Sequence, residues 1–134
     1  MDLDLTPSTR SHGAQRMITA TVLVCEALVV FFAVLVAHQL APDDRALTWT
    51  WGLVTAIALL LNGGLLSRGA WAYWLALALQ VPAILLGLQV SAMWVIGLGF
   101  AAMLAYGMVK GHQLDREKDA VDARLLASDG TDER

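Results

Sequence analysis

The chain alternates between long apolar runs and short polar breaks. The first run covers residues 17–39 and holds Glu26 as its only Asp, Glu, Lys or Arg residue. A short break with Pro42 and two aspartates separates it from a second run over about 48–66. At a rise of ~1.5 Å per residue, ~20 apolar residues cross a hydrocarbon core ~30 Å thick. The pattern therefore predicts one membrane-spanning helix in each run.

The first run also resembles the apolar part of a cleaved signal peptide, because Arg10 and Arg16 precede it. It is too long for that role, however, contains an acidic residue and lacks a small-x-small cleavage site at its end. A membrane span is the better interpretation.

The third apolar run is too long for a single helix. It extends from Trp71 to Val109, about twice the length that one crossing needs. Gly87, Gln89 and Ser91 are the only cluster of turn-compatible residues far from both of its ends. A turn at 87–92 therefore predicts two further spans, at about 71–87 and 93–109.

Polar segments flank the spans at both ends of the chain. Residues 1–16 show no apolar periodicity, which predicts a polar tail with little structure of its own. Residues 110–134 alternate in charge, with apolar residues at helical spacing, which predicts a charged tail that is helical to about Leu126 and disordered beyond it. The predicted fold is all-α: a polytopic membrane protein with an antiparallel four-helix transmembrane bundle.

Cationic residues are unevenly divided between the two sides of this bundle. With four spans both tails lie on one side, and the other side holds Arg45 alone, beside two aspartates. Because Lys and Arg near spans stay in the cytoplasm, both termini are predicted to be cytoplasmic, in a multi-pass protein of the plasma membrane. The cations on the tail side are Arg10, Arg16, Arg68, Lys110, Arg116, Lys118 and Arg124.

Aromatic residues near the span ends are typical of interfacial belts. On this interpretation they divide into an outer set, Trp49, Trp51 and Trp94, and an inner set, Trp71, Tyr73, Trp74 and Tyr106.

Composition narrows the function classes. The chain is 57% hydrophobic, against ~45–50% in soluble domains, so the lipid bilayer is its expected partner. A single cysteine excludes an internal disulfide and a multi-cysteine zinc site, and a net charge of −3 leaves no basic surface for nucleic acid. No nucleophilic set, phosphate-binding glycine loop or metal-ligand spacing is present, so we expect no enzymatic activity, no cofactor and no metal.

The candidate site centres on Glu26, the one ionisable residue deep in a span. It lies nine residues, or ~13 Å, into the first span, and the same arithmetic places Gln80 at equal depth and Thr55 near it. Pro82 leaves the Ala78 carbonyl without its helical partner. These groups are predicted to form a polar layer at mid-membrane, serving either as a proton or cation site or as a neutral carboxyl bonded to Gln80 that fixes helix packing.

Small residues recur every four positions in two spans, at Ala72 and Ala76 and along the fourth span from Gly97. Such spacing lets helix backbones approach closely in lipid, so these positions are predicted to be packing seams. Gly107 and Gly111 repeat the spacing at the inner edge, where a contact in a dimer and a chance repeat are both open.

Several motifs of the chain occur together in one known family. They are ATVLVCEALVVFFAVLVA, the Gly69-Ala70-Trp71 start of span three, the Gly87 turn and MWVIGLGF before the charged tail, with Glu26, Trp71, Gln80 and the Gly97 and Phe100 pair as the distinctive positions. Over about residues 16–118 the chain thereby resembles the actinobacterial membrane proteins of domain of unknown function family 4233. The resemblance implies an actinobacterial plasma membrane and no defined activity.

A partial similarity to small multidrug resistance transporters is also present, because those are short four-span chains with an essential glutamate in the first span. The strong cation bias and the two long polar tails depart from that pattern. We therefore expect a non-enzymatic accessory or assembly component with a membrane-protein partner or a homo-oligomeric form. A proton-coupled exporter of small molecules or cations that uses Glu26 is the alternative.

Overall fold

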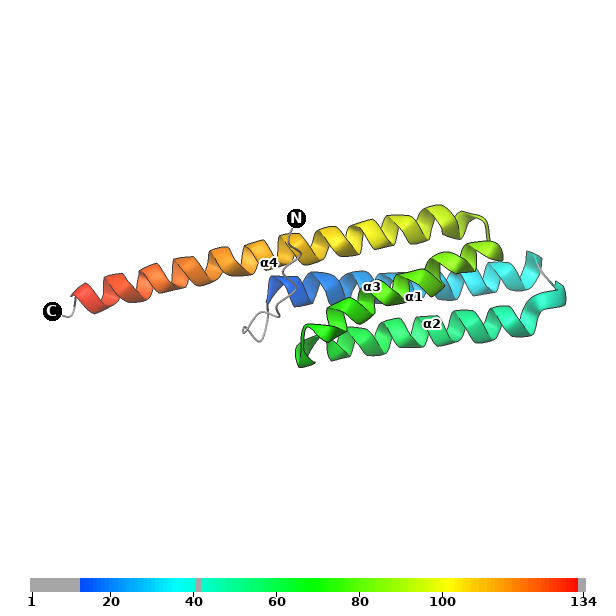
Figure 1. The fold of residues 1–134 in the computed structure, drawn as a ribbon, viewed down its shortest axis with the longest axis horizontal. Coiled ribbons are helices and arrows are strands. Elements are labelled where there is room, and N and C mark those ends of the chain that lie inside the picture. The colour runs from blue at the N-terminus through cyan, green and yellow to red at the C-terminus, as the bar shows by residue number, and fades with distance from the viewer. Residues whose placement is uncertain (1–12, 41, 133–134) are drawn as a thin grey trace.

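The computed structural model describes residues 13–40 and 42–132, and these form four long helices joined by short 3-10 turns (Figure 1). With the 3-10 turns that extend the second and third helices counted in, all four are long and apolar enough to cross a membrane. This confirms the predicted all-α, multi-pass fold. The helices are α1 (Ala14–Leu40), α2 (Arg45–Leu65), α3 (Trp71–Leu85) and α4 (Ala92–Asp132), and the turns are η1 (Pro42–Asp44), η2 (Leu66–Arg68) and η3 (Leu86–Leu88).

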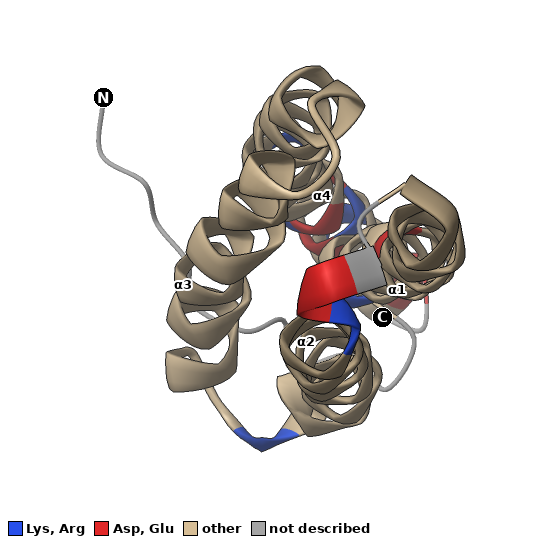
Figure 2. Ribbon diagram, turned by 90° about the vertical axis from the view of Figure 1, so that its right-hand side faces the viewer, with Lys and Arg blue, Asp and Glu red and all other residues tan. Residues whose placement is uncertain are grey.

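Successive helices run in opposite directions and form a ring in chain order, as the end-on view in Figure 2 shows. We call the end with η1 and η3 the distal end. The proximal end holds η2 and the start of α1, and α4 projects beyond it (Figure 1). The first described residues and the projecting part of α4 are therefore on the same side of the bundle. Whether that side is cytoplasmic stays a prediction.

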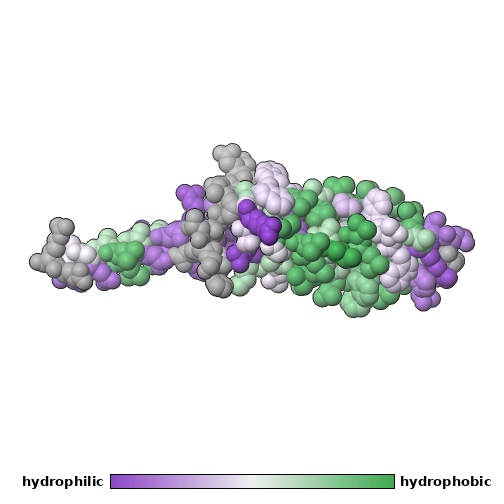
Figure 3. Space-filling view, turned by 90° about the horizontal axis from the view of Figure 1, so that it is seen from below, coloured by the Kyte–Doolittle hydropathy of each residue, from purple (hydrophilic) through white to green (hydrophobic). Residues whose placement is uncertain are grey.

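The bundle core is built from one stripe of each helix. On α1 the buried positions recur at intervals of three and four residues, as for Leu23, Ala27 and Val30. Close approach to α2 depends on Gly52, which packs on the side chain of Val34. The outward faces are also apolar and give the bundle a continuous hydrophobic surface with polar ends (Figure 3). Such an exposed surface suits lipid rather than water.

The last helix is longer than the sequence pattern predicts. α4 continues unbroken past Val109 and through the segment after Leu126, which was predicted to be disordered, to Asp132. That prediction is wrong for residues 127–132. The span has already nucleated the helix, and adding residues to an existing helix costs far less than starting one. Residues 133–134 lie outside the described part of the chain.

The first helix begins earlier than predicted, within the segment assigned to a polar tail. Ala14 and Gln15 are helical and buried, because they pack against α4 at the proximal end. The rest of that predicted tail, residues 1–12, including Arg10, lies outside the described residues.

Candidate functional site

Glu26 and Gln80 meet in the core of the bundle. Their side chains are 1% and 3% exposed, and Gln80 Nε2 donates a hydrogen bond to Glu26 Oε2 over 2.7 Å. The contact joins α1 to α3, helices that run in the same direction (Figure 1). The structure thus brings together the two residues that were predicted to meet because they lie at equal depth in the membrane.

The surroundings of this pair are apolar. One turn away on the same helices, the side chains of Leu23, Val30 and Ala76 are fully buried. Glu26 Oε1 and Gln80 Oε1 have no hydrogen-bond partner within the described residues. A charged carboxylate is costly there, whereas a neutral carboxyl is both donor and acceptor and matches a carboxamide. The pair can therefore act as a packing contact or hold a proton.

Thr55 does not join the pair. It is buried, but its hydroxyl donates over 2.8 Å to the carbonyl of Trp51, one turn earlier on its own helix. No hydrogen bond links it to Glu26 or Gln80 in the described chain. A Thr hydroxyl finds a partner on the preceding turn of its helix at little cost, so similar depth alone does not bring it across the bundle.

Pro82 contributes its own carbonyl to a contact between helices, while the role predicted for the Ala78 carbonyl stays a prediction. The Pro82 oxygen accepts the indole N–H of Trp51 at 2.9 Å, which ties α2 to α3. Trp51 is therefore an inter-helix contact as well as an aromatic near a span end. Tyr73, predicted for the inner interfacial belt, is 1% exposed and belongs to the core.

Two further polar residues on α1 lie on the same face as Glu26. Gln15 and Thr19 are fully buried. Thr19 lies four residues after Gln15, and Glu26 lies eleven residues after Gln15. Gln15 Nε2 donates to the carbonyl of Met108 at 3.3 Å, while the Thr19 hydroxyl and Gln15 Oε1 have no partner among the described residues. Their helical spacing from Glu26 could have indicated a shared face in the sequence, but Gln15 was assigned to the polar tail and was therefore not compared with Glu26.

Asp115 is another buried residue that the sequence analysis did not single out. It is 2% exposed, and its carboxylate accepts the backbone N–H of Ala14 at 2.6 Å and of Gln15 at 3.1 Å. It thus caps the N-terminus of α1 from a distant part of the chain, where a negative charge also favours the helix dipole. In a tail of alternating charge nothing distinguishes this acid from its neighbours.

The Glu26–Gln80 contact predicts measurable coupling between the two side chains. In a double-mutant cycle with Glu26→Leu and Gln80→Leu, unfolding in detergent micelles should give an interaction free energy of about 1 kcal/mol, the range of inter-helix hydrogen bonds in membranes. The same cycle with Thr55→Val in place of Gln80→Leu is the control and should give coupling near zero. Equal coupling in both cycles would contradict the paired arrangement.

Comparison with known proteins places this arrangement in a family. No curated protein and no solved structure matches the chain. Residues 16–120 match the family described as Protein of unknown function (DUF4233). The match includes all four spans, Glu26, Gln80 and Asp115, and the chain belongs to that family.

Proposed function

We propose that this protein is a non-enzymatic accessory or assembly component of the plasma membrane that binds a protein partner through the projecting part of α4. The observation that carries the proposal is the segment Arg116–Asp132, which is helical and exposed along its whole length. It extends away from the bundle (Figure 1). Most helical stability in proteins comes from packing of one face against a neighbour, so a partner that covers one face would stabilise this segment beyond what extension of the span supplies.

The partner's chemistry follows from the exposed face. Leu114, Val121 and Leu125 lie along one side at intervals of seven and four residues, and all are exposed. Leu114 and Val121 line a shallow surface pocket together with Glu117, Lys118 and Asp122. Apolar anchors at this spacing suit a hydrophobic groove, and flanks that carry both signs of charge suit a groove with a charged rim.

A second copy of this helix is a poorer partner. In a parallel coiled coil that buries Val121 and Leu125, Lys118 would occupy a core position. Glu117 of one chain would then face Asp122 of the other, and like charges at these positions repel. We therefore assign the face to a different protein.

Orientation belongs to the same proposal. The described cations near the spans, apart from Arg45, come from the proximal end or the projecting helix, among them Arg16, Arg68 and Lys110. This bias supports cytoplasmic termini and hence a partner in the cytoplasm or at the inner face of the membrane.

A face-specific crosslinking experiment tests the proposal in the native membrane. A photo-crosslinking amino acid at Leu125 should give one defined protein adduct, while the same group at Ala123, about 160° away around the helix, should give none. Adducts of equal yield from both positions, or only adducts with a second copy, would contradict it. The predicted cytoplasmic orientation has its own test: a cysteine in place of Leu125 should react with a membrane-impermeant maleimide only after the cells are opened.

Proton-coupled export through Glu26 is the second candidate, supported by the row of buried Gln15, Thr19 and Glu26 along one face of α1. Growth in toxic cations separates the two functions. Glu26→Gln keeps a polar group beside Gln80. The accessory role predicts that cells carrying this variant grow in toxic cations like cells carrying the wild type. Loss of resistance in Glu26→Gln without loss of protein from the membrane would favour export.

A further inference from the structure

Two side-chain hydrogen bonds connect the start of α2 to the end of α1 at the distal end, and both are accepted by His38. The indole N–H of Trp49 donates to His38 Nδ1 over 3.1 Å, and the two rings meet edge to face with their centroids 5.9 Å apart. Arg45 Nε donates to the backbone carbonyl of His38 over 3.2 Å. His38 is therefore the residue on which these contacts across η1 depend.

The bond from Trp49 requires one protonation state of His38. An indole N–H is a donor only, and an imidazole nitrogen accepts a hydrogen bond only while it carries no proton. Nδ1 is therefore unprotonated in this contact, and the neutral ring has its proton on Nε2. An imidazolium carries protons on both nitrogens. Protonated His38 thus cannot accept the hydrogen bond of Trp49.

His38 lies where it can exchange a proton with water. Its side chain and that of Trp49 are only half-buried, at the polar distal end of the bundle (Figure 3). Among the described residues, the other ionisable groups at this end are Asp43, Asp44 and Arg45, in the red and blue turn between α1 and α2 in Figure 2. Arg45 disfavours a second positive charge, whereas the two carboxylates and the carbonyl end of α1 favour one.

The packing next to His38 confines any change to the distal end. One turn deeper on α1, the fully buried Val34 packs on Gly52 of α2. Neither residue has an ionisable group, so this contact does not respond to pH. Loss of the Trp49 bond therefore frees the ends of the two helices and leaves their crossing in place.

We propose that His38 and Trp49 form a pH-sensitive latch at the distal end of the bundle. At neutral pH the uncharged imidazole holds the indole of Trp49 and closes the end of the α1–α2 hairpin. Histidine changes charge between about pH 8 and 5. Acidification places a proton on Nδ1, two donors then face each other, and the side chains separate. With cytoplasmic termini, as proposed above, the latch responds to pH outside the cell, but its chemistry does not depend on the accessory role.

Nuclear magnetic resonance of the indole N–H groups tests the latch in the full chain. The protein is labelled with ¹⁵N-tryptophan in detergent micelles and titrated from about pH 8 to 5, the range in which histidine changes charge. The signal of Trp49 is the one that Trp49→Phe lacks, and it should move in a single-proton transition. Its exchange rate with water, relative to that of Trp51, should rise about five-fold on acidification, the effect of one lost hydrogen bond of about 1 kcal/mol.

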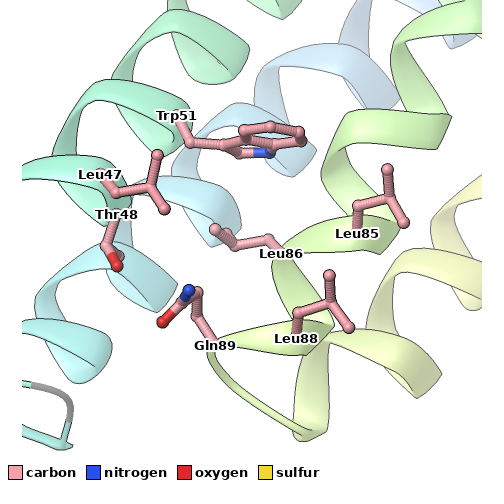
Figure 4. Close-up of a pocket in the computed structure, with 7 residues that line it drawn as sticks. All are labelled: Leu47, Thr48, Trp51, Leu85, Leu86, Leu88 and Gln89. Atoms are coloured by element: carbon pink, nitrogen blue, oxygen red, sulfur yellow. The ribbon is translucent and has the colours of Figure 1, made fainter. Parts of the chain in front are cut away.

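Trp51 is the internal control, two residues further along the same helix. Its indole reaches from α2 toward α3 above Leu86 (Figure 4) and donates to the Pro82 carbonyl over 2.9 Å. A backbone carbonyl carries no proton in this range. The Trp51 signal should therefore stay constant, and it also reports whether a variant retains the packing of α2 on α3.

Two variants of His38 make the result specific. His38→Asn keeps an amide oxygen near the position of Nδ1 but takes up no proton, so the Trp49 signal should be independent of pH. His38→Phe keeps a ring without an acceptor, so Trp49 should exchange at every pH at the fast relative rate of the acidified wild type. A Trp49 signal that does not move in the wild type would overturn the proposal. A transition that persists in His38→Asn would assign the effect to Asp43 or Asp44 and would also overturn it.

Discussion

Replacing Asp115 with alanine should lower the free energy of unfolding by about 3 kcal/mol, because it strands two buried backbone N–H groups that now bond to a carboxylate. Those donors belong to Ala14 and Gln15, the first residues of α1, and both are buried. Water cannot replace the lost acceptor without opening the contact between α1 and α4. Reversible unfolding in detergent micelles, followed by circular dichroism, measures the change.

A neighbouring acid provides the matched control. Glu117 is exposed on the same helix, so Glu117→Ala should change the free energy of unfolding by less than about 0.5 kcal/mol. Asp115→Asn keeps one acceptor oxygen and should lie between the two. If Asp115→Ala were as stable as Glu117→Ala, the cap would contribute nothing and α1 would not depend on α4 for its start.

Gly111→Ala is expected to destabilise the protein by about 2 kcal/mol, because a methyl group there overlaps the backbone of α1. A Cβ on Gly111 would lie 2.8 Å from the backbone nitrogen of Gln15 and nearer still to its Cα. A flexible side chain moves aside at low cost, but helix backbone does not. The same unfolding measurement applies, and Gly111→Leu should show a larger loss.

Gly99→Ala is the control on the same helix. No atom lies within 4 Å of a Cβ built on Gly99, so alanine should be neutral or should stabilise by about 0.5–1 kcal/mol through its higher helix propensity. Equal losses at Gly99 and Gly111 would indicate a general effect of glycine in α4 and not a close approach of α1 and α4.

The two variants also separate a contact within the chain from a contact between chains. Gly107 and Gly111 were open to interpretation as a dimer surface, but the structure packs both against α1, at Ile18 and Gln15. The loss in Gly111→Ala should therefore be independent of protein concentration. A loss of stability that grows on dilution would instead assign Gly107 and Gly111 to a contact between chains.

The candidate site was predictable where depth in the membrane was enough. Glu26 and Gln80 lie equally far along helices that run in the same direction, and each is polar in an apolar stretch, so each needs a partner at that depth. Thr55 satisfied the same depth argument, yet bonds within its own helix. Distance along a helix axis carries no information on the direction around it, and a short hydroxyl side chain has a partner close by.

By itself the sequence determined the class of the protein, because membrane-spanning helices satisfy their own backbone hydrogen bonds and need only ~20 apolar residues in a row. Both conditions are local, so run lengths and breaks were sufficient for four antiparallel spans. Only the tertiary structure decided which helix faces meet: that Asp115 caps α1, that Gly111 packs on Gln15, and that Trp51 of α2 bonds the Pro82 carbonyl of α3. These contacts join residues far apart in the chain, and their energies depend on rotation and close packing of whole helices, which no local pattern encodes.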